Sequence, residues 1–191
     1  KITTNLFQRH KKIIFIFSAY FLGIVCSMSF VFVFFGYSAV FSMQTKTIEG
    51  FTASATSYGN FERFFANNSK VMLLTFLLST MFGAGAILIL AWNASVIAVY
   101  IGLLTRPLAE QIGGAAYLYA LPFGLGAIAF HGIPEITAYF IAGLAGGILS
   151  VGMIRERIGS VEFKEILKDS LILLSAAEIL IFTAAAIEAF L

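Results

Sequence analysis

The chain alternates long apolar runs with short polar stretches, which is the pattern of a protein that crosses a bilayer several times. Residues 13–35 contain no charged side chain, and as a helix rising about 1.5 Å per residue they span a hydrocarbon core of about 30 Å. This run is too long for the apolar part of a signal peptide, so we expect an uncleaved first span. Similar runs at 71–91, 115–130, 136–153 and 170–191 predict four more spans.

Shorter stretches lie between these runs. Residues 93–104 are apolar but reach only about 15 Å as a helix, so they predict a re-entrant half-helix with Asn93 as its N-cap. Residues 51–68 mix phenylalanines with charges of both signs and predict an interfacial amphipathic segment. The polar residues 67–69 are N-cap types and predict the start of the next span. The stretch 131–135 contains Gly and Pro and predicts a turn between two spans.

Together these elements predict an all-α, polytopic membrane protein with about five transmembrane helices, one half-helix and one interfacial segment in a single membrane domain. Lysine and arginine favour the cytoplasmic side of a span. They gather in the amino-terminal tail, residues 1–12, and in the connection 155–168. We therefore expect a multi-pass protein of the cell membrane, with its amino terminus in the cytoplasm and, after five crossings, its carboxyl terminus outside.

Composition narrows the class of protein further. Of the 191 residues, 60% are hydrophobic and 12% are charged, whereas soluble domains have about 45–50% and about 25%. The net charge of +2 is not gathered into the basic patch that nucleic-acid binding requires. The expected partner is therefore the lipid bilayer and not a nucleic acid. A single cysteine, Cys26, excludes a disulfide within the chain and a cysteine-based metal site.

Small residues in the fourth predicted span indicate close helix packing. Gly143 and Gly147 have the GxxxG spacing, and Ala142 and Gly146 extend the small face. Such a face lets a second helix approach closely. The neighbour is either another helix of this chain or a second copy of it.

Two acids in the last predicted span need an explanation, because a charged group at the bilayer centre costs about 2.5–3.5 kcal/mol or more. Glu178 is the deepest acid in the chain. It either locks two helices by a hydrogen bond or binds a proton, cation or substrate in a wet cavity. Glu188 lies about 15 Å further along the helix, so the two acids do not share one small site.

A third candidate group lies at residues 131–135. Pro134 and Glu135 suit the first turn of a helix, where an acid is favoured by the helix dipole. His131 could be a metal ligand, a proton acceptor or a hydrogen-bond partner of Glu135 or Glu188. His131, Glu135 and Glu188 form a candidate metal set, although one histidine is few for zinc. The sequence identifies no cofactor.

The order of these features resembles the stage II sporulation protein M family. The matching pieces are Asn67-Asn68, Gly83, Gly85, Asn93, the turn His131-Gly132-Ile133-Pro134-Glu135, the small residues 142–147 and the ending Ile187-Glu188-Ala189-Phe190. The resemblance runs from about residue 60 to the end and implies an integral membrane protein of about five spans. In endospore-forming bacteria the family's namesake looks like a non-enzymatic anchor that recruits cell-wall hydrolases. Relatives also occur in organisms without spores, so that role is not transferred here.

Three functions are therefore expected in turn. The first is a membrane scaffold that assembles protein partners, favoured by the absence of a catalytic motif and by the aromatic segment 51–68. The second is a transporter or channel that moves a proton, ion or small solute past Asn93, Glu178 and His131. The third is an intramembrane metal-dependent hydrolase. Protein partners or a second copy of the chain are the expected binding partners besides lipid.

Overall fold

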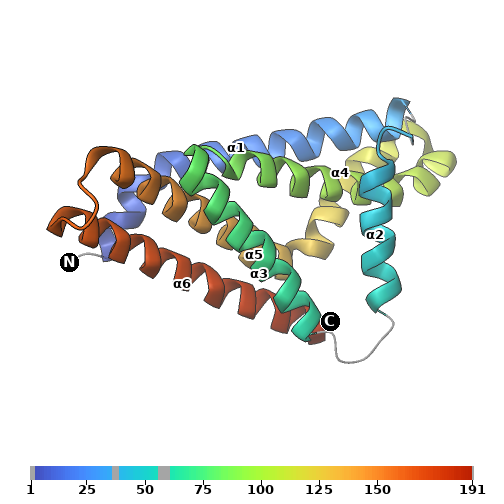
Figure 1. The fold of residues 1–191 in the computed structure, drawn as a ribbon. Helices are drawn as coiled ribbons and strands as arrows, with labels where there is room; N and C mark the ends of the chain where they lie inside the picture. The colour runs from blue at the N-terminus through green and yellow to red at the C-terminus, as the bar shows by residue number, and fades with distance from the viewer. Residues whose placement is uncertain (1–2, 36–38, 56–60, 191) are drawn as a thin grey trace. The chain divides into compact units, whose positions relative to one another are not determined.

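A computed structural model describes the backbone of residues 3–35, 39–55 and 61–190, and their side chains except at 3–14, 51–55, 127 and 190. All regular structure in these residues is helical (Figure 1). In chain order the elements are α1 (Thr3–Phe35), α2 (Ser42–Ala55), α3 (Phe61–Phe82), α4 (Ala86–Ile112), the short 3-10 helix η1 (Gly113–Ala115), α5 (Ala116–Arg155) and α6 (Val161–Phe190).

Four helical stretches within the described residues are long and apolar enough to cross a membrane. They are Phe15–Phe35, Ala86–Gly126, Ile128–Arg155 and Val161–Ala189. The predicted all-α membrane fold is thereby confirmed. Helix α3 falls short of this measure, since Asn67, Asn68 and Lys70 make its first half polar. The number of five spans stays a prediction, as does the orientation of the termini.

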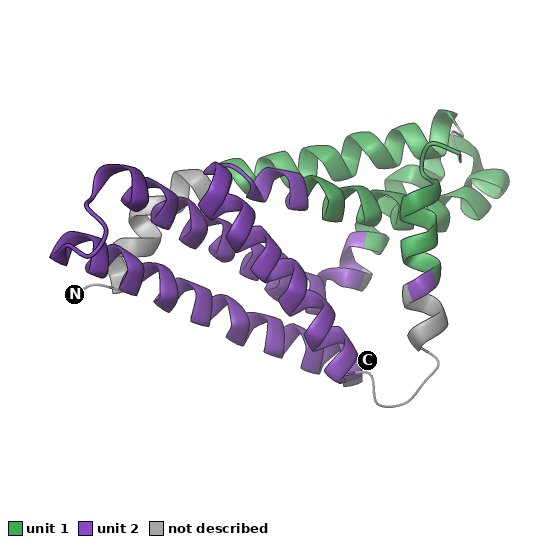
Figure 2. Ribbon diagram, viewed as in Figure 1, with its two compact units in different colours: residues 1–49, 91–124 green, residues 50–90, 125–191 purple. Residues whose placement is uncertain are grey.

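The chain divides into two compact units (Figure 2). Unit 1 comprises residues 1–49 and 91–124, and unit 2 comprises residues 50–90 and 125–191. Unit 1 therefore contains α1, most of α4 and the beginnings of α2's sequence and of α5. Unit 2 contains α3, α6 and the larger part of α5.

Aromatic packing forms the core of unit 1. Phe32 of α1, Phe41 and Val99 of α4 are all buried and lie together. The ring of Phe32 also receives the guanidinium of Arg106, whose Cζ lies 5.0 Å from the ring centroid, a cation–π contact. Gly102 of α4 faces the same ring, where a Cβ atom would collide with it. A glycine at this position therefore allows α1 and α4 to pack closely.

Hydrogen bonds between neutral groups join the other elements of unit 1. The hydroxyl of Tyr117, at the start of α5, donates to the carbonyl of Cys26 at 2.9 Å and lies 2.8 Å from the hydroxyl of Ser29. The amide of Gln44 in α2 donates to Ser95 of α4 at 3.2 Å. These bonds satisfy side-chain groups inside the unit that water could not reach in a bilayer.

Unit 2 is a bundle in which α3 runs parallel to the second part of α5 and antiparallel to α6 (Figure 1). Ser170 at the start of α6 donates to the carbonyl of Ala145 at 3.0 Å, near the end of α5. The aromatic ring of Phe61, at the start of α3, lies 5.1 Å from that of Phe182 near the end of α6. Each helix thus meets its neighbours along most of its length.

The small residues of α5 face α3 and the residues that follow it. A Cβ atom on Gly143 would lie 2.6 Å from the Cβ of Ala86, and one on Gly146 would collide with the carbonyl oxygen of Phe76. A Cβ on Gly147 would come 3.4 Å from the carbonyl oxygen of Gly83. The neighbour that approaches this face in the structure is therefore a segment of the same chain.

The predicted span 71–91 differs from the structure, which contains two helices there. Helix α3 ends at Phe82, and Gly83 has φ of 69°, a left-handed conformation that glycine adopts without strain. The backbone N–H of Ala86, at the start of α4, donates to the hydroxyl of Ser79 at 2.9 Å. A side chain of the first helix thus satisfies a terminal donor of the second helix, and the break becomes possible within an apolar run.

The predicted half-helix and the predicted turn at 131–135 also differ from the structure. Helix α4 begins at Ala86 and continues to Ile112 with Pro107 inside it, so Asn93 is an interior residue and not an N-cap. Helix α5 continues through 131–135. The polar side chains that suggested a turn find partners on neighbouring helices, so the backbone has no need to leave the helix. Re-entrance into the membrane stays a prediction.

The interfacial segment predicted at 51–68 falls partly outside the described residues, at 56–60. Its last part forms the first turns of α3. Phe64 is buried there, and the rings of Phe61 and Phe65 each pack edge-on against Phe182 of α6, at 5.1 and 5.9 Å. Residues 61–65 therefore contribute their aromatic side chains to the bundle, because α6 offers them an apolar partner.

Candidate functional site

Glu135 of α5 uses both of its carboxyl oxygens inside unit 2. Its Oε1 accepts a hydrogen bond from the hydroxyl of Tyr139 at 2.7 Å, and its Oε2 accepts one from the side-chain amide of Asn68 at 3.2 Å. The amide of Asn67 donates in turn to Oδ1 of Asn68 at 3.2 Å. Tyr139 lies one helical turn after Glu135, the spacing at which side chains of a helix meet. Glu135 thereby connects α5 to α3.

Burial makes these contacts important for the bundle. Tyr139 is only 1% exposed and Asn68 is 6% exposed, and Glu135 is half-buried. A buried polar group that loses its hydrogen bond costs about 1–3 kcal/mol. The three side chains therefore satisfy one another in a region where neither water nor lipid would replace the lost bonds.

Glu188 of α6 brings a second acid to the same region. Its carboxyl group interacts electrostatically with Glu135 and with Tyr139. We call Asn68, Glu135, Tyr139 and Glu188 the carboxyl cluster, which draws on α3, α5 and α6. The sequence predicted that Glu188 reaches the depth of residues 131–135, and the structure brings it to Glu135.

Glu178 forms a separate polar contact. The hydroxyl of Ser69 in α3 donates to Oε1 of Glu178 in α6 at 2.7 Å. Ser69 follows Asn68 directly in the sequence, and successive residues of a helix point about 100° apart. Helix α3 therefore uses two adjacent side chains to reach α5 and α6. Glu178 is half-buried, and its bond to Ser69 is that of an acid joining two helices.

His131 lies one turn before Glu135 on α5, but the two residues are not joined by a hydrogen bond. Its buried Nδ1 has no hydrogen-bond partner in the structure, while the oxygens of Glu135 are used by Asn68 and Tyr139. Among the residues that the structure describes, no group of three or more His, Cys, Asp and Glu side chains could hold a metal ion. The set His131, Glu135 and Glu188 is thus not assembled as a ligand group.

The remaining predicted residues lie elsewhere. Asn93 is a half-buried residue of α4 in unit 1, whereas His131, Glu135, Glu178 and Glu188 all belong to unit 2. Gly143 and Gly147 face Ala86 and Gly83, as described above. The proposed combination of Asn93 with the acids of unit 2 therefore has no structural support.

Three partner residues of the acids are not evident from the sequence. Asn68 and Ser69 look like helix caps, because Asn and Ser before an apolar run are typical N-cap residues. Tyr139 lies in an apolar run and carries no signal of its own. The i, i+4 spacing of Glu135 and Tyr139 would have indicated the pair, once 131–139 is understood as one continuous helix.

Residues 13–191 match the sequence model of a protein family described as Stage II sporulation protein M. The match covers nearly the whole chain, including both units. No curated protein and no solved structure matches the chain.

Proposed function

Because the chain belongs to the stage II sporulation protein M family, we propose that it acts as a non-enzymatic membrane scaffold that holds protein partners. The observation that carries this proposal is the hydrogen bond between Ser69 and Glu178. A deep acid is the feature that a scaffold least requires, and here it has a role in joining α3 to α6.

The packing of unit 2 supports the same proposal. Glu135 is bonded to α3 through Asn68, and the glycines of α5 bring that helix against the backbone of α3. A bundle fixed by close packing and by internal hydrogen bonds presents a constant outer surface. A scaffold needs such a surface, since partners bind best to a shape that is already formed.

The proposal is tested by extracting the protein from its native membrane in polymer-bounded lipid discs and weighing the intact particles by native mass spectrometry. We expect a second protein in a fixed ratio to the chain. Glu178→Gln should retain it, because the amide oxygen still accepts from Ser69. Glu178→Leu should lose most of it, because α3 and α6 lose their bond.

A matched control comes from another serine of unit 2. Ser175 bonds only to the carbonyl of Leu171 within its own helix, at 2.9 Å, so Ser175→Ala should retain the partner while Ser69→Ala weakens its binding. Discs that contain the chain without any protein partner would contradict the scaffold.

Transport coupled to a proton or cation is a second candidate, and the carboxyl cluster favours it. Glu135 and Glu188 interact electrostatically, and two carboxylates close together in a bilayer repel unless a proton or a cation accompanies them. Such a pair is the kind of group that coupled transporters use to load and release a positive charge.

This candidate is tested in sealed vesicles that contain the purified protein and a pH-sensitive dye. A transporter should carry protons or sodium ions across the bilayer, and Glu135→Gln should abolish that flux while Glu62→Gln, an exposed acid of α3, should leave it unchanged. Glu178→Gln distinguishes the roles of the two acid groups. Wild-type vesicles that show no flux above empty vesicles would contradict transport.

A further inference from the structure

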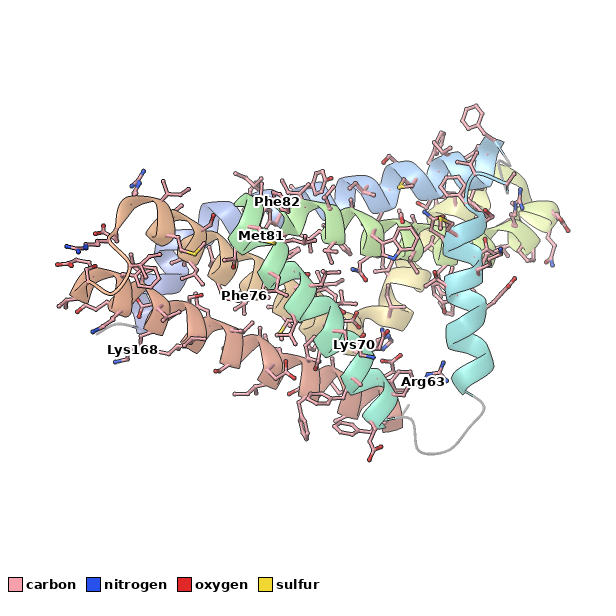
Figure 3. All side chains as sticks on the ribbon, in the orientation of Figure 1. Arg63, Lys70, Phe76, Met81, Phe82 and Lys168 are labelled. Atoms are coloured by element: carbon pink, nitrogen blue, oxygen red, sulfur yellow. The ribbon has the colours of Figure 1, made fainter. Side chains whose placement is uncertain are left out.

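An open groove follows one exposed face of α6 in unit 2. It has a volume of about 600 Å³ and lies entirely on this helix. Its lining residues are Lys164, Leu167, Lys168, Leu171, Ile172, Ser175, Ala176 and Ile179. Lys168 marks its charged end near the start of α6 (Figure 3). From there to Ile179 the groove is apolar apart from Ser175, whose hydroxyl is bonded to the carbonyl of Leu171.

The charges at this groove are one-sided. Lys164 and Lys168 lie one helical turn apart, on the same face, and neither forms an ion pair with a residue that the structure describes. The neighbouring acids Glu162, Glu165 and Asp169 do not line the groove. Two lysines without partners therefore stand together at the polar end of an apolar channel.

The length of the apolar part matches one leaflet of a bilayer. The eleven positions from Lys168 to Ile179 extend about 16 Å along a helix, and half of a hydrocarbon core is about 15 Å. Lysines at the end of a spanning helix reach the headgroup level while their stems stay on apolar surface. Small side chains at 175 and 176 leave space beside the helix at the depth of an acyl chain.

From this arrangement we propose that the groove on α6 binds an anionic phospholipid. The headgroup phosphate pairs with the ammonium groups of Lys164 and Lys168, and one acyl chain lies along Leu171, Ser175 and Ile179. Basic groups at the membrane surface select anionic over zwitterionic headgroups, and the apolar groove gives the bound lipid a defined position. This site is independent of the scaffold proposal, which rests on the interior of unit 2.

The test compares wild-type protein with the double variant Lys164→Gln and Lys168→Gln in detergent at low salt. Phosphatidylglycerol and phosphatidylcholine with identical acyl chains are added, and bound lipid is counted by native mass spectrometry. Wild-type protein should retain phosphatidylglycerol preferentially. The double variant should bind it roughly 10- to 30-fold more weakly, given the attraction of a surface lysine for an anionic headgroup, and should bind phosphatidylcholine as before.

Two controls make the result specific to the groove. Arg155→Gln with Arg157→Gln removes the same charge from exposed residues that do not line it, and should leave the preference intact. Ala176→Phe fills the groove without changing charge and should reduce binding of phosphatidylglycerol severalfold. Because residue 176 is exposed, helix content measured by circular dichroism should be unchanged.

Three outcomes would overturn the proposal. The arginine variant could lose as much binding as the lysine variant, which would indicate a diffuse charge effect. Ala176→Phe, with normal helix content, could bind as well as wild type, which would exclude the acyl chain from the groove. Finally, glycerol phosphate could compete with phosphatidylglycerol at equal concentration, which would indicate a site for a soluble phosphate and not for a lipid.

Discussion

Closest packing in unit 1 is made against a side chain, whereas in unit 2 it is made against backbone. Gly102 of α4 faces the ring of Phe32, and Gly146 of α5 faces the carbonyl oxygen of Phe76 and the Cβ of Ser79. A ring changes its rotamer, but a helical backbone cannot move without moving the helix. The two units should therefore respond differently to the same substitution.

The polar contacts differ in the same direction. Unit 1 joins its helices with neutral groups, such as the hydroxyl of Tyr117 and the carbonyl of Cys26. Unit 2 uses the carboxyl groups of Glu135 and Glu178 as acceptors. Hydrogen bonds to charged groups are stronger than those between neutral groups, and their loss is more costly. Unit 2 is thus expected to be the more sensitive unit.

The largest effect is expected for Gly146→Ala. The added methyl meets backbone atoms of α3, so the two helices must separate, and we expect the free energy of unfolding to fall by about 3 kcal/mol. Thermal unfolding of the purified protein in detergent measures the change. Gly126→Ala serves as the control, because a Cβ there meets nothing within 4 Å. Equal loss in both variants would contradict the close approach of α5 to α3.

Gly102→Ala in unit 1 sharpens the comparison between the units. Its methyl meets the ring of Phe32, which is able to rotate partly away, and we expect a loss of about 1.5 kcal/mol. The same unfolding measurement applies. If Phe32→Leu is combined with it, the loss caused by Gly102→Ala should become smaller. An unchanged loss in that background would show that the ring is not the obstacle.

Two tyrosine variants compare the polar contacts. Tyr139→Phe removes a donor from Glu135 and should cost about 1.5 kcal/mol. Tyr117→Phe should cost about 0.5 kcal/mol, because Ser29 also donates to the carbonyl of Cys26, at 3.1 Å. Unfolding of both variants under one condition gives the ratio. Equal losses would mean that the charge of the acceptor does not matter here.

The smallest effect is expected for Arg106→Gln in unit 1. The guanidinium lies 5.0 Å from the ring centroid of Phe32, and its loss should cost about 0.5 kcal/mol. Arg63→Gln, an exposed residue of unit 2 (Figure 3), provides the control and should leave the unfolding temperature unchanged. A loss for Arg106→Gln no larger than that for Arg63→Gln would remove the cation–π contact from the description of unit 1.

Apolar runs predict the helices well and their breaks poorly. Residues 13–35 and 170–191 fall within α1 and α6, because a long uncharged run has few other structures available in a membrane. The break at Gly83 is not evident, since it depends on Ser79 accepting from Ala86 across the turn. The continuity of α5 through 131–135 is equally hidden, since it depends on partners in another helix.

The same reason limits prediction of the candidate site. Glu135, Glu178 and Glu188 stand out in the sequence because acids are rare in spanning helices. Their partners Asn68, Ser69 and Tyr139 are residue types that are common in helices and at helix ends. Only the pairing of α3 with α5 and α6 identifies them, and no spacing within one helix encodes that pairing.

The adjacency of Asn68 and Ser69 makes α3 a shared reference for two other helices. Asn68 is bonded to α5 and Ser69 to α6, and one step along a helix turns the side chain by about 100°. A rotation of α3 about its own axis would withdraw both donors together, since they belong to one rigid turn. The angular setting of α3 is therefore a single variable that α5 and α6 experience at the same time.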